Sequence, residues 1–94
     1  MPEELAVELG AKVKALRLLA GWKRVTLAER AGVSVASLRR FESTGRGSIM
    51  LVLRVAFSLG RLDEFGGLLN LPPAASIADM EQRLAVNIRK RGRK

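Results

Sequence analysis

The segment from residue 24 to residue 43 constrains the fold most, because it fits two short helices joined by one tight turn. Gly32 ends the first helix, since glycine readily adopts the positive φ of a left-handed helix terminus. Ser34 is a natural N-cap for the second helix, which runs through Glu42. Ala28 is small enough to leave room where the two helices cross. The segment therefore predicts a pair of helices that cross closely at a steep angle.

Four apolar residues recur where these two helices would face each other, and they predict the wedge packed between them: Leu27, Val33, Leu38 and Phe41. The first helix of the pair has two possible starts. The run from Thr26 to Glu29 matches a capping box, which would begin the helix at Leu27. The alternative begins the helix at Arg24, with Lys23 as a poor cap.

Helical signals continue through the rest of the chain, and strand signals are absent. Pro2 suits the first position of a helix, and Gly21 stops that helix. Ser48 caps a later helix that ends at Gly60. The predicted helices cover about 3–20, 24–31, 35–42, 49–59, 61–69 and 76–88. The chain is thus predicted to be all-α.

The prolines at 72 and 73 divide the chain into two parts. Residues 1–71 are predicted to form one helical domain, and residues 72–94 a C-terminal extension. That extension is expected to hold an amphipathic helix over about 76–88, capped by Ser76, and a disordered basic tail.

The predicted helices over 49–59 and 61–69 have apolar positions on more than one face. The inward positions are expected to be Ile49, Val52, Leu53, Ala56 and Leu59 in the first, and Leu62, Phe65, Leu68 and Leu69 in the second. Gly66 and Gly67 each cost the second helix roughly 1 kcal/mol relative to alanine, so it needs tertiary support. Three further apolar residues lie off the inward stripe: Met50, Leu51 and Phe57. They indicate either a protein interface or a wide core stripe shared with the helix over 61–69.

The distribution of charge favours a polyanionic partner. The formal charge is +8, with nine positive charges in excess over residues 12–61 and six over residues 83–94. Acidic segments over residues 1–11 and 62–82 separate these regions. A basic middle and a basic end are the electrostatic pattern of nucleic-acid-binding proteins, although membrane-surface helices share it.

The composition excludes several function classes. The chain contains no cysteine and no histidine, which removes disulfides, thiolate or imidazole metal sites and His- or Cys-based catalysis. Its carboxylates form no evident catalytic pair, so neither an enzyme nor a bound cofactor is expected. The acidic start does not resemble a signal peptide, and no uncharged stretch is long enough to span a bilayer. A cytoplasmic protein without a membrane partner, associated with the nucleoid when bound to DNA, is therefore expected.

Residues 24–43, RVTLAERAGVSVASLRRFES, resemble the helix-turn-helix motif of the Xre family, the family of Cro and the phage repressors. Members carry a small residue at the fifth position, glycine at the ninth, and apolar residues at the fourth, tenth, fifteenth and eighteenth. All six positions match, and this register favours Arg24 as the start of the first helix. The resemblance covers roughly residues 8–71 and implies a five-helix domain. Lys23 and Arg24 depart from it, because a capping Thr or Asn and a Gln are common there.

The resemblance also implies how the motif binds double-stranded DNA. The second helix of the pair would lie in the major groove and read bases. The base-reading positions are Val35, Ala36, Ser37, Arg39 and Arg40, and the backbone-contacting positions are Lys23, Arg24, Ser34, Ser43 and Arg46. Arg40 suits a bidentate contact to guanine, and Val35 or Ala36 suits a thymine methyl group. Two further residues, Arg17 and Glu42, correspond to a structural salt bridge of phage repressors. Trp22 is expected to pack at the corner between the first two helices rather than to stack on bases.

A narrower resemblance concerns the run SLRRFESTGRGSIMLVLRVAFSLGRLDEF and the basic end, which look like HipB-type antitoxins. Such antitoxins bind their own operator and a HipA-like kinase toxin. The leading interpretation is a dimeric operator-binding autorepressor, either an antitoxin or a free-standing phage-type repressor. A protein-interaction module that mainly restrains a toxin kinase is the second, and a non-specific binder driven by the tail is the third.

Overall fold

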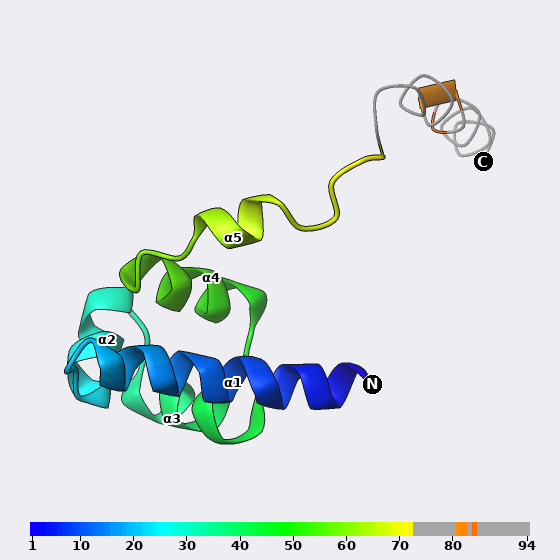
Figure 1. The fold of residues 1–94 in the computed structure, drawn as a ribbon. Coiled ribbons are helices and arrows are strands. Elements are labelled where there is room, and N and C mark those ends of the chain that lie inside the picture. The colour runs from blue at the N-terminus through cyan, green and yellow to red at the C-terminus, as the bar shows by residue number, and fades with distance from the viewer. Residues whose placement is uncertain (73–80, 83, 85–94) are drawn as a thin grey trace, which may run out of the picture.

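The computed structural model describes residues 1–72, 81, 82 and 84, and the described part is entirely α-helical (Figure 1). Its five helices are α1 (Pro2–Leu19), α2 (Arg24–Ala31), α3 (Val35–Thr44), α4 (Ile49–Ser58) and α5 (Asp63–Gly66). The helices run through the positions that the sequence predicts, so the all-α, five-helix expectation is confirmed. Apart from Glu81, Gln82 and Leu84, the helix predicted over 76–88 and the basic tail lie outside the described residues.

The core lies between α2, α3 and α4, with α1 laid across α3 (Figure 1). Its buried members are Leu27, Ala28, Ala31, Leu38, Phe41, Leu51 and Val55. Leu9, Val13, Trp22, Val33 and Val35 are among the half-buried residues that pack against it. The predicted wedge is therefore confirmed, since all four of its apolar residues belong to this core or contact it.

The caps of α2, α3 and α4 agree with the sequence. Gly32 ends α2 at φ 69°. The hydroxyls of Ser34 and Ser48 accept hydrogen bonds from the backbone N–H groups of Ser37 and Leu51, each at 3.0 Å. α2 starts at Arg24, and its N-cap Lys23 makes no side-chain hydrogen bond. The capping-box alternative, which would start the helix at Leu27, is therefore wrong.

α1 approaches α3 and the following turn at two glycines. A Cβ atom at Gly10 would lie 2.2 Å from the carbonyl oxygen of Phe41. Gly45 ends α3 at φ 76°, and a Cβ atom there would lie 2.3 Å from the backbone of Ala6. Neither backbone approach leaves space for a side chain, so the two glycines set how closely α1 packs. α3 also runs to Thr44, two residues further than predicted.

The buried face of α4 differs from the prediction. Leu51 is only 7% exposed and belongs to the core, whereas Ile49 is 68% exposed. The buried side is centred on Leu51 and Val55, which are one turn apart, and Leu51 packs over Gly47. Met50 and Phe57 are exposed, as predicted for residues off the inward stripe.

α5 is shorter than predicted, covering four residues instead of nine. Leu62, Leu68 and Leu69 were expected to point inward but are exposed, and only Phe65 is half-buried. The glycines at 66 and 67 explain the early end, because consecutive glycines disfavour helix and offer no side chain to pack. Among the described residues, no helix has the length and hydropathy needed to cross a membrane.

Candidate nucleic-acid interface

The first two turns of α3 present a set of exposed side chains. Four of the five predicted base-reading residues are exposed: Ala36, Ser37, Arg39 and Arg40. Val35 is half-buried and packs against the core, so part of its side chain anchors α3 to the core. Leu38 and Phe41, on the opposite side of α3, are almost completely buried. The exposed face is thus anchored rigidly to the core through the same helix.

Two serines at the start of α3 form a local hydrogen-bonded pair. The hydroxyl of Ser34 accepts from the backbone N–H of Ser37 and donates to the Ser37 hydroxyl at 2.8 Å. The hydroxyl of Ser34 is therefore occupied by the cap. The hydroxyl of Ser37 accepts from Ser34 and keeps its own proton, which it can donate to a ligand.

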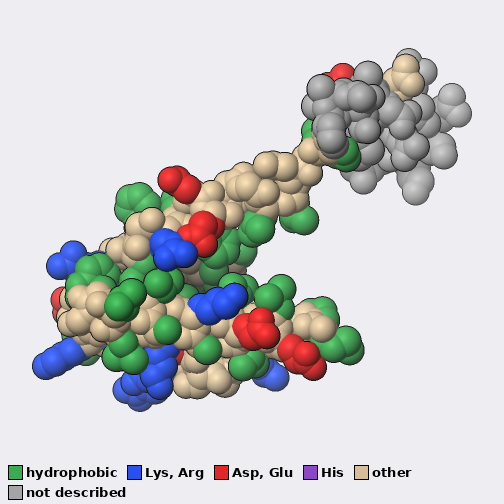
Figure 2. Space-filling model, in the orientation of Figure 1, with side chains coloured by type: hydrophobic (Ala, Val, Ile, Leu, Met, Phe, Trp, Pro, Cys, Tyr) green, Lys and Arg blue, Asp and Glu red, His purple; other side chains and the backbone are tan. Residues whose placement is uncertain are grey.

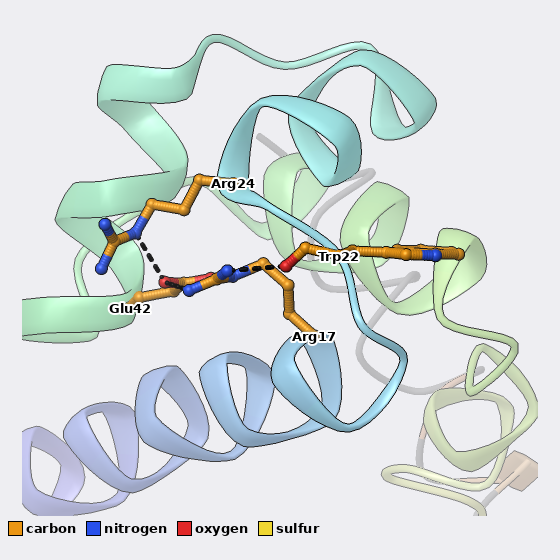
Figure 3. Close-up of polar contacts among 4 residues, drawn as sticks. All are labelled: Arg17, Trp22, Arg24 and Glu42. Atoms are coloured by element: carbon orange, nitrogen blue, oxygen red, sulfur yellow. Dashed lines mark hydrogen bonds and ion pairs between the residues drawn. The ribbon is translucent and has the colours of Figure 1, made fainter.

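Glu42 joins α3 to both α1 and α2 through two arginines (Figure 3). The Arg17 Nε donates to Glu42 Oε2 at 2.8 Å, and Arg17 also donates to the carbonyl oxygen of Trp22 at 2.9 Å. The Arg24 Nε donates to Glu42 Oε1 at 2.9 Å. The predicted pair of Arg17 and Glu42 is confirmed, and Arg24 joins it as a third member that sequence reasoning missed.

The three members of this network differ in exposure. The Glu42 side chain is fully buried and that of Arg17 is 6% exposed, whereas that of Arg24 is 31% exposed. Arg24 is bonded to Glu42 through Nε, and the two terminal nitrogens of its guanidinium have no hydrogen-bond partner among the described residues. Arg24 is thus held by the protein at one edge and open at the other.

The turn after α3 is fixed by one threonine. The Thr44 hydroxyl donates to the carbonyl oxygen of Arg40 at 2.7 Å and accepts from the backbone N–H of Arg46 at 3.1 Å. Ser43 and Arg46 are exposed beside it, and Lys23 is exposed at the start of α2. The backbone at Arg46 is therefore tied to the end of α3, a link that the sequence pattern did not reveal.

Basic side chains gather over α2 and α3, whereas near α5 they mix with acidic ones, as in the ion pair of Arg61 with Glu64. Figure 2 shows basic side chains gathered at the lower edge of the view, over α2 and α3. Acidic side chains lie on the N-terminal half of α1 and near α5 (Figure 2). The exposed face of α3 is thus bordered by positive potential on the side of α2, which suits a phosphate backbone.

The comparison with known families agrees with this geometry. A family model described as "Helix-turn-helix domain" matches residues 8–76. The chain belongs to this helix-turn-helix family. No curated protein and no solved structure matches it. The family match is consistent with the Xre resemblance and does not test the narrower one to HipB-type antitoxins.

Trp22 of this helix-turn-helix protein lies at the corner between α1 and α2, as predicted. Its ring is half-buried against the core, and the guanidinium of Arg30 lies 4.5 Å from the ring centroid. This cation–π contact occupies one face of the ring, which fits the expectation that Trp22 supports the scaffold rather than stacks on a base.

Proposed function

We propose that this helix-turn-helix protein is a transcriptional regulator that binds a specific double-stranded DNA sequence with α3 in the major groove. The exposed face of α3, with Arg39 and Arg40 above the buried Leu38 and Phe41, carries the proposal. Arg40 would contact guanine, Ala36 a thymine methyl group, and Ser37 a base edge. The half-buried Val35 would add apolar contact at the edge of the groove.

Residues around this face would hold the DNA backbone. Arg24 offers its free guanidinium edge, and Lys23 and Arg46 are exposed cations on either side. Ser43 is exposed, and Ser34, whose hydroxyl is used in the cap, would contribute its backbone N–H. Backbone contacts of this kind set the register of the protein on the duplex without reading sequence.

Selection from a library of random duplexes tests the proposal directly. We expect a preferred sequence to be enriched, and Arg40→Ala to lose preference at one base pair of it. Enrichment of no sequence, with equal affinity for all duplexes, would contradict specific recognition and favour a non-specific binder.

We further propose that the protein acts as a homodimer on an inverted repeat, with half-sites about one helical turn, roughly 34 Å, apart. One α3 contacts too few base pairs for high specificity. Met50 and Phe57, seven residues apart on α4, are 54% and 70% exposed and offer an apolar surface for a second copy. Sedimentation of the complex with selected DNA is expected to give two chains per duplex. One chain bound to a single half-site would contradict the dimer.

A second candidate function is that of an antitoxin, which binds a HipA-like kinase as well as its own operator. The same exposed residues of α4 support it, because a toxin would require an apolar surface away from α3. If the neighbouring gene encodes a kinase-like protein, co-expression is expected to yield a complex that Phe57→Asp disrupts while DNA binding persists. A stable dimer without such a partner would favour a free-standing repressor.

The basic end of the chain has two proposed roles that a salt titration separates. Removal of residues 89–94 deletes five positive charges. If these residues contact the DNA backbone, truncation lowers affinity for every duplex and flattens the salt dependence, since each neutralised phosphate contributes about 0.9 to the slope. If they bind an acidic partner protein, the salt slope stays unchanged and the partner complex weakens.

A further inference from the structure

The acidic start of α1 lies beside the positive end of the proposed DNA-binding face. Glu3, Ala6 and Val7 of α1 line a surface hollow of about 520 Å³ together with Arg40, Thr44 and Arg46. The close approach of Gly45 to the Ala6 backbone holds these elements in contact. A carboxylate on α1 thus shares one hollow with two arginines proposed to bind DNA.

The Glu3 carboxylate is not used in an ion pair that stabilises the described part of the fold. Glu3, Arg40 and Arg46 are all exposed, and no ion pair joins Glu3 to either arginine in the described part of the chain. Glu3 also precedes residues 8–76, which the family model matches. It therefore lies outside the matched helix-turn-helix region.

We propose that Glu3 limits the affinity of this protein for DNA by repelling the phosphate backbone near Arg46 and by attracting both Arg40 and Arg46. The inference rests on the proposed DNA-binding function. When a duplex lies against α3, a phosphate near the arginines meets the negative charge of Glu3 within about one Debye length, which is roughly 10 Å at 0.1 M salt. Before binding, the same carboxylate attracts the two arginines, and DNA must compete with that attraction.

The expected effect is moderate and independent of base sequence. A unit charge about 5–10 Å from a phosphate in water changes Kd by about two- to four-fold. Because Glu3 opposes phosphates, which every duplex carries, Glu3→Gln is expected to tighten binding to selected and mixed-sequence duplexes equally. Glu3→Lys is expected to tighten it further.

Glu4→Gln provides a matched control. It removes the same charge from the same first turn of α1, and so has the same effect on net charge and helix dipole. Glu4 does not line the hollow, so its replacement is expected to change Kd by about 1.5-fold or less. In the Arg40→Ala/Arg46→Ala background, the difference between the two variants is expected to shrink, because the competition for the arginines is gone.

Fluorescence anisotropy with a 20-base-pair mixed-sequence duplex, at several salt concentrations between about 0.05 and 0.2 M, is a suitable measurement. A larger gain for Glu3→Gln than for Glu4→Gln, fading as salt rises, supports the inference. Equal gains for the two variants, or no gain, overturn it while wild-type binding leaves the DNA-binding function intact. If wild type and Glu3→Lys both fail to bind any duplex, the inference and the proposed function fall together.

Discussion

Gly10→Ala adds a methyl group where α1 crosses α3. The new Cβ would lie 2.2 Å from the Phe41 carbonyl oxygen and 3.2 Å from that of Glu42. Carbon–oxygen contacts of this kind normally span about 3.3–3.6 Å, so α1 would have to move away by roughly 1 Å. Both obstructing atoms are backbone atoms of a helix, which cannot turn aside as a side chain would.

The net effect combines two opposing contributions. Alanine in a helix interior is favoured over glycine by about 1 kcal/mol, whereas overpacking costs about 1–3 kcal/mol and occasionally more. Because the obstruction is backbone, we take the upper end of that range, which leaves a net loss of about 2 kcal/mol. For a domain of this size the melting temperature should fall by about 8–16 °C.

Thermal unfolding followed by circular dichroism measures this loss. Gly66→Ala is the matched control, since a Cβ atom there meets nothing within 4 Å and the melting temperature should stay the same or rise. A Gly10→Ala protein as stable as the wild type, or more stable, would refute the reasoning from close approach.

Three further predictions concern charged side chains. Glu42→Gln should destabilise the fold by about 3–5 kcal/mol in urea unfolding, because it leaves the buried Arg17 guanidinium without its carboxylate. A loss below about 1 kcal/mol would contradict this prediction. Arg40→Ala should cost about 1–3 kcal/mol of binding free energy mainly on the selected sequence, whereas Arg24→Ala should weaken binding to all duplexes similarly. If Arg40→Ala weakens binding to selected and unselected duplexes equally, Arg40 is a phosphate contact. On the exposed surface, Arg61 Nε donates a hydrogen bond to Glu64 Oε2, which lowers the pKa of the Glu64 carboxyl below its ordinary 4.5. Arg61→Gln should therefore raise that pKa in an NMR titration. Since the lowered pKa belongs to the folded state, any stability from this exposed pair exists above pH 4.5 and is lost as the pH falls through the folded-state pKa.

Features encoded by neighbouring residues were predictable from the sequence. Gly32 and the caps at Ser34 and Ser48 depend on local backbone conformation and on hydrogen bonds that span three residues. The wedge residues followed from helical spacing within one motif. For the same reason the exposed face of α3 was predictable from helical spacing alone.

Features that depend on how distant helices approach one another were not predictable. On a helix as apolar as α4, periodicity alone fits several faces, and packing within the core buries Leu51 rather than Ile49. Gly10 carried no sequence signal of its role, because its reason is a carbonyl group 31 residues away in α3. Arg24 joined Glu42 for a similar reason, since only the folded chain brings them together.

The bond between Arg24 and Glu42 has an entropic consequence for DNA binding. A free arginine loses rotational freedom when it grips a phosphate, which costs about 0.5–1.5 kcal/mol for each side chain immobilised. Arg24 has already lost part of that freedom through its Nε hydrogen bond, whereas the Arg40 side chain makes no hydrogen bond within the described chain. Contact at Arg24 should therefore form at a smaller entropic penalty than contact at Arg40. A lysine at position 24 would keep the charge but lose this restraint, because its ammonium group cannot hold a carboxylate at one edge and a phosphate at the other in a fixed plane.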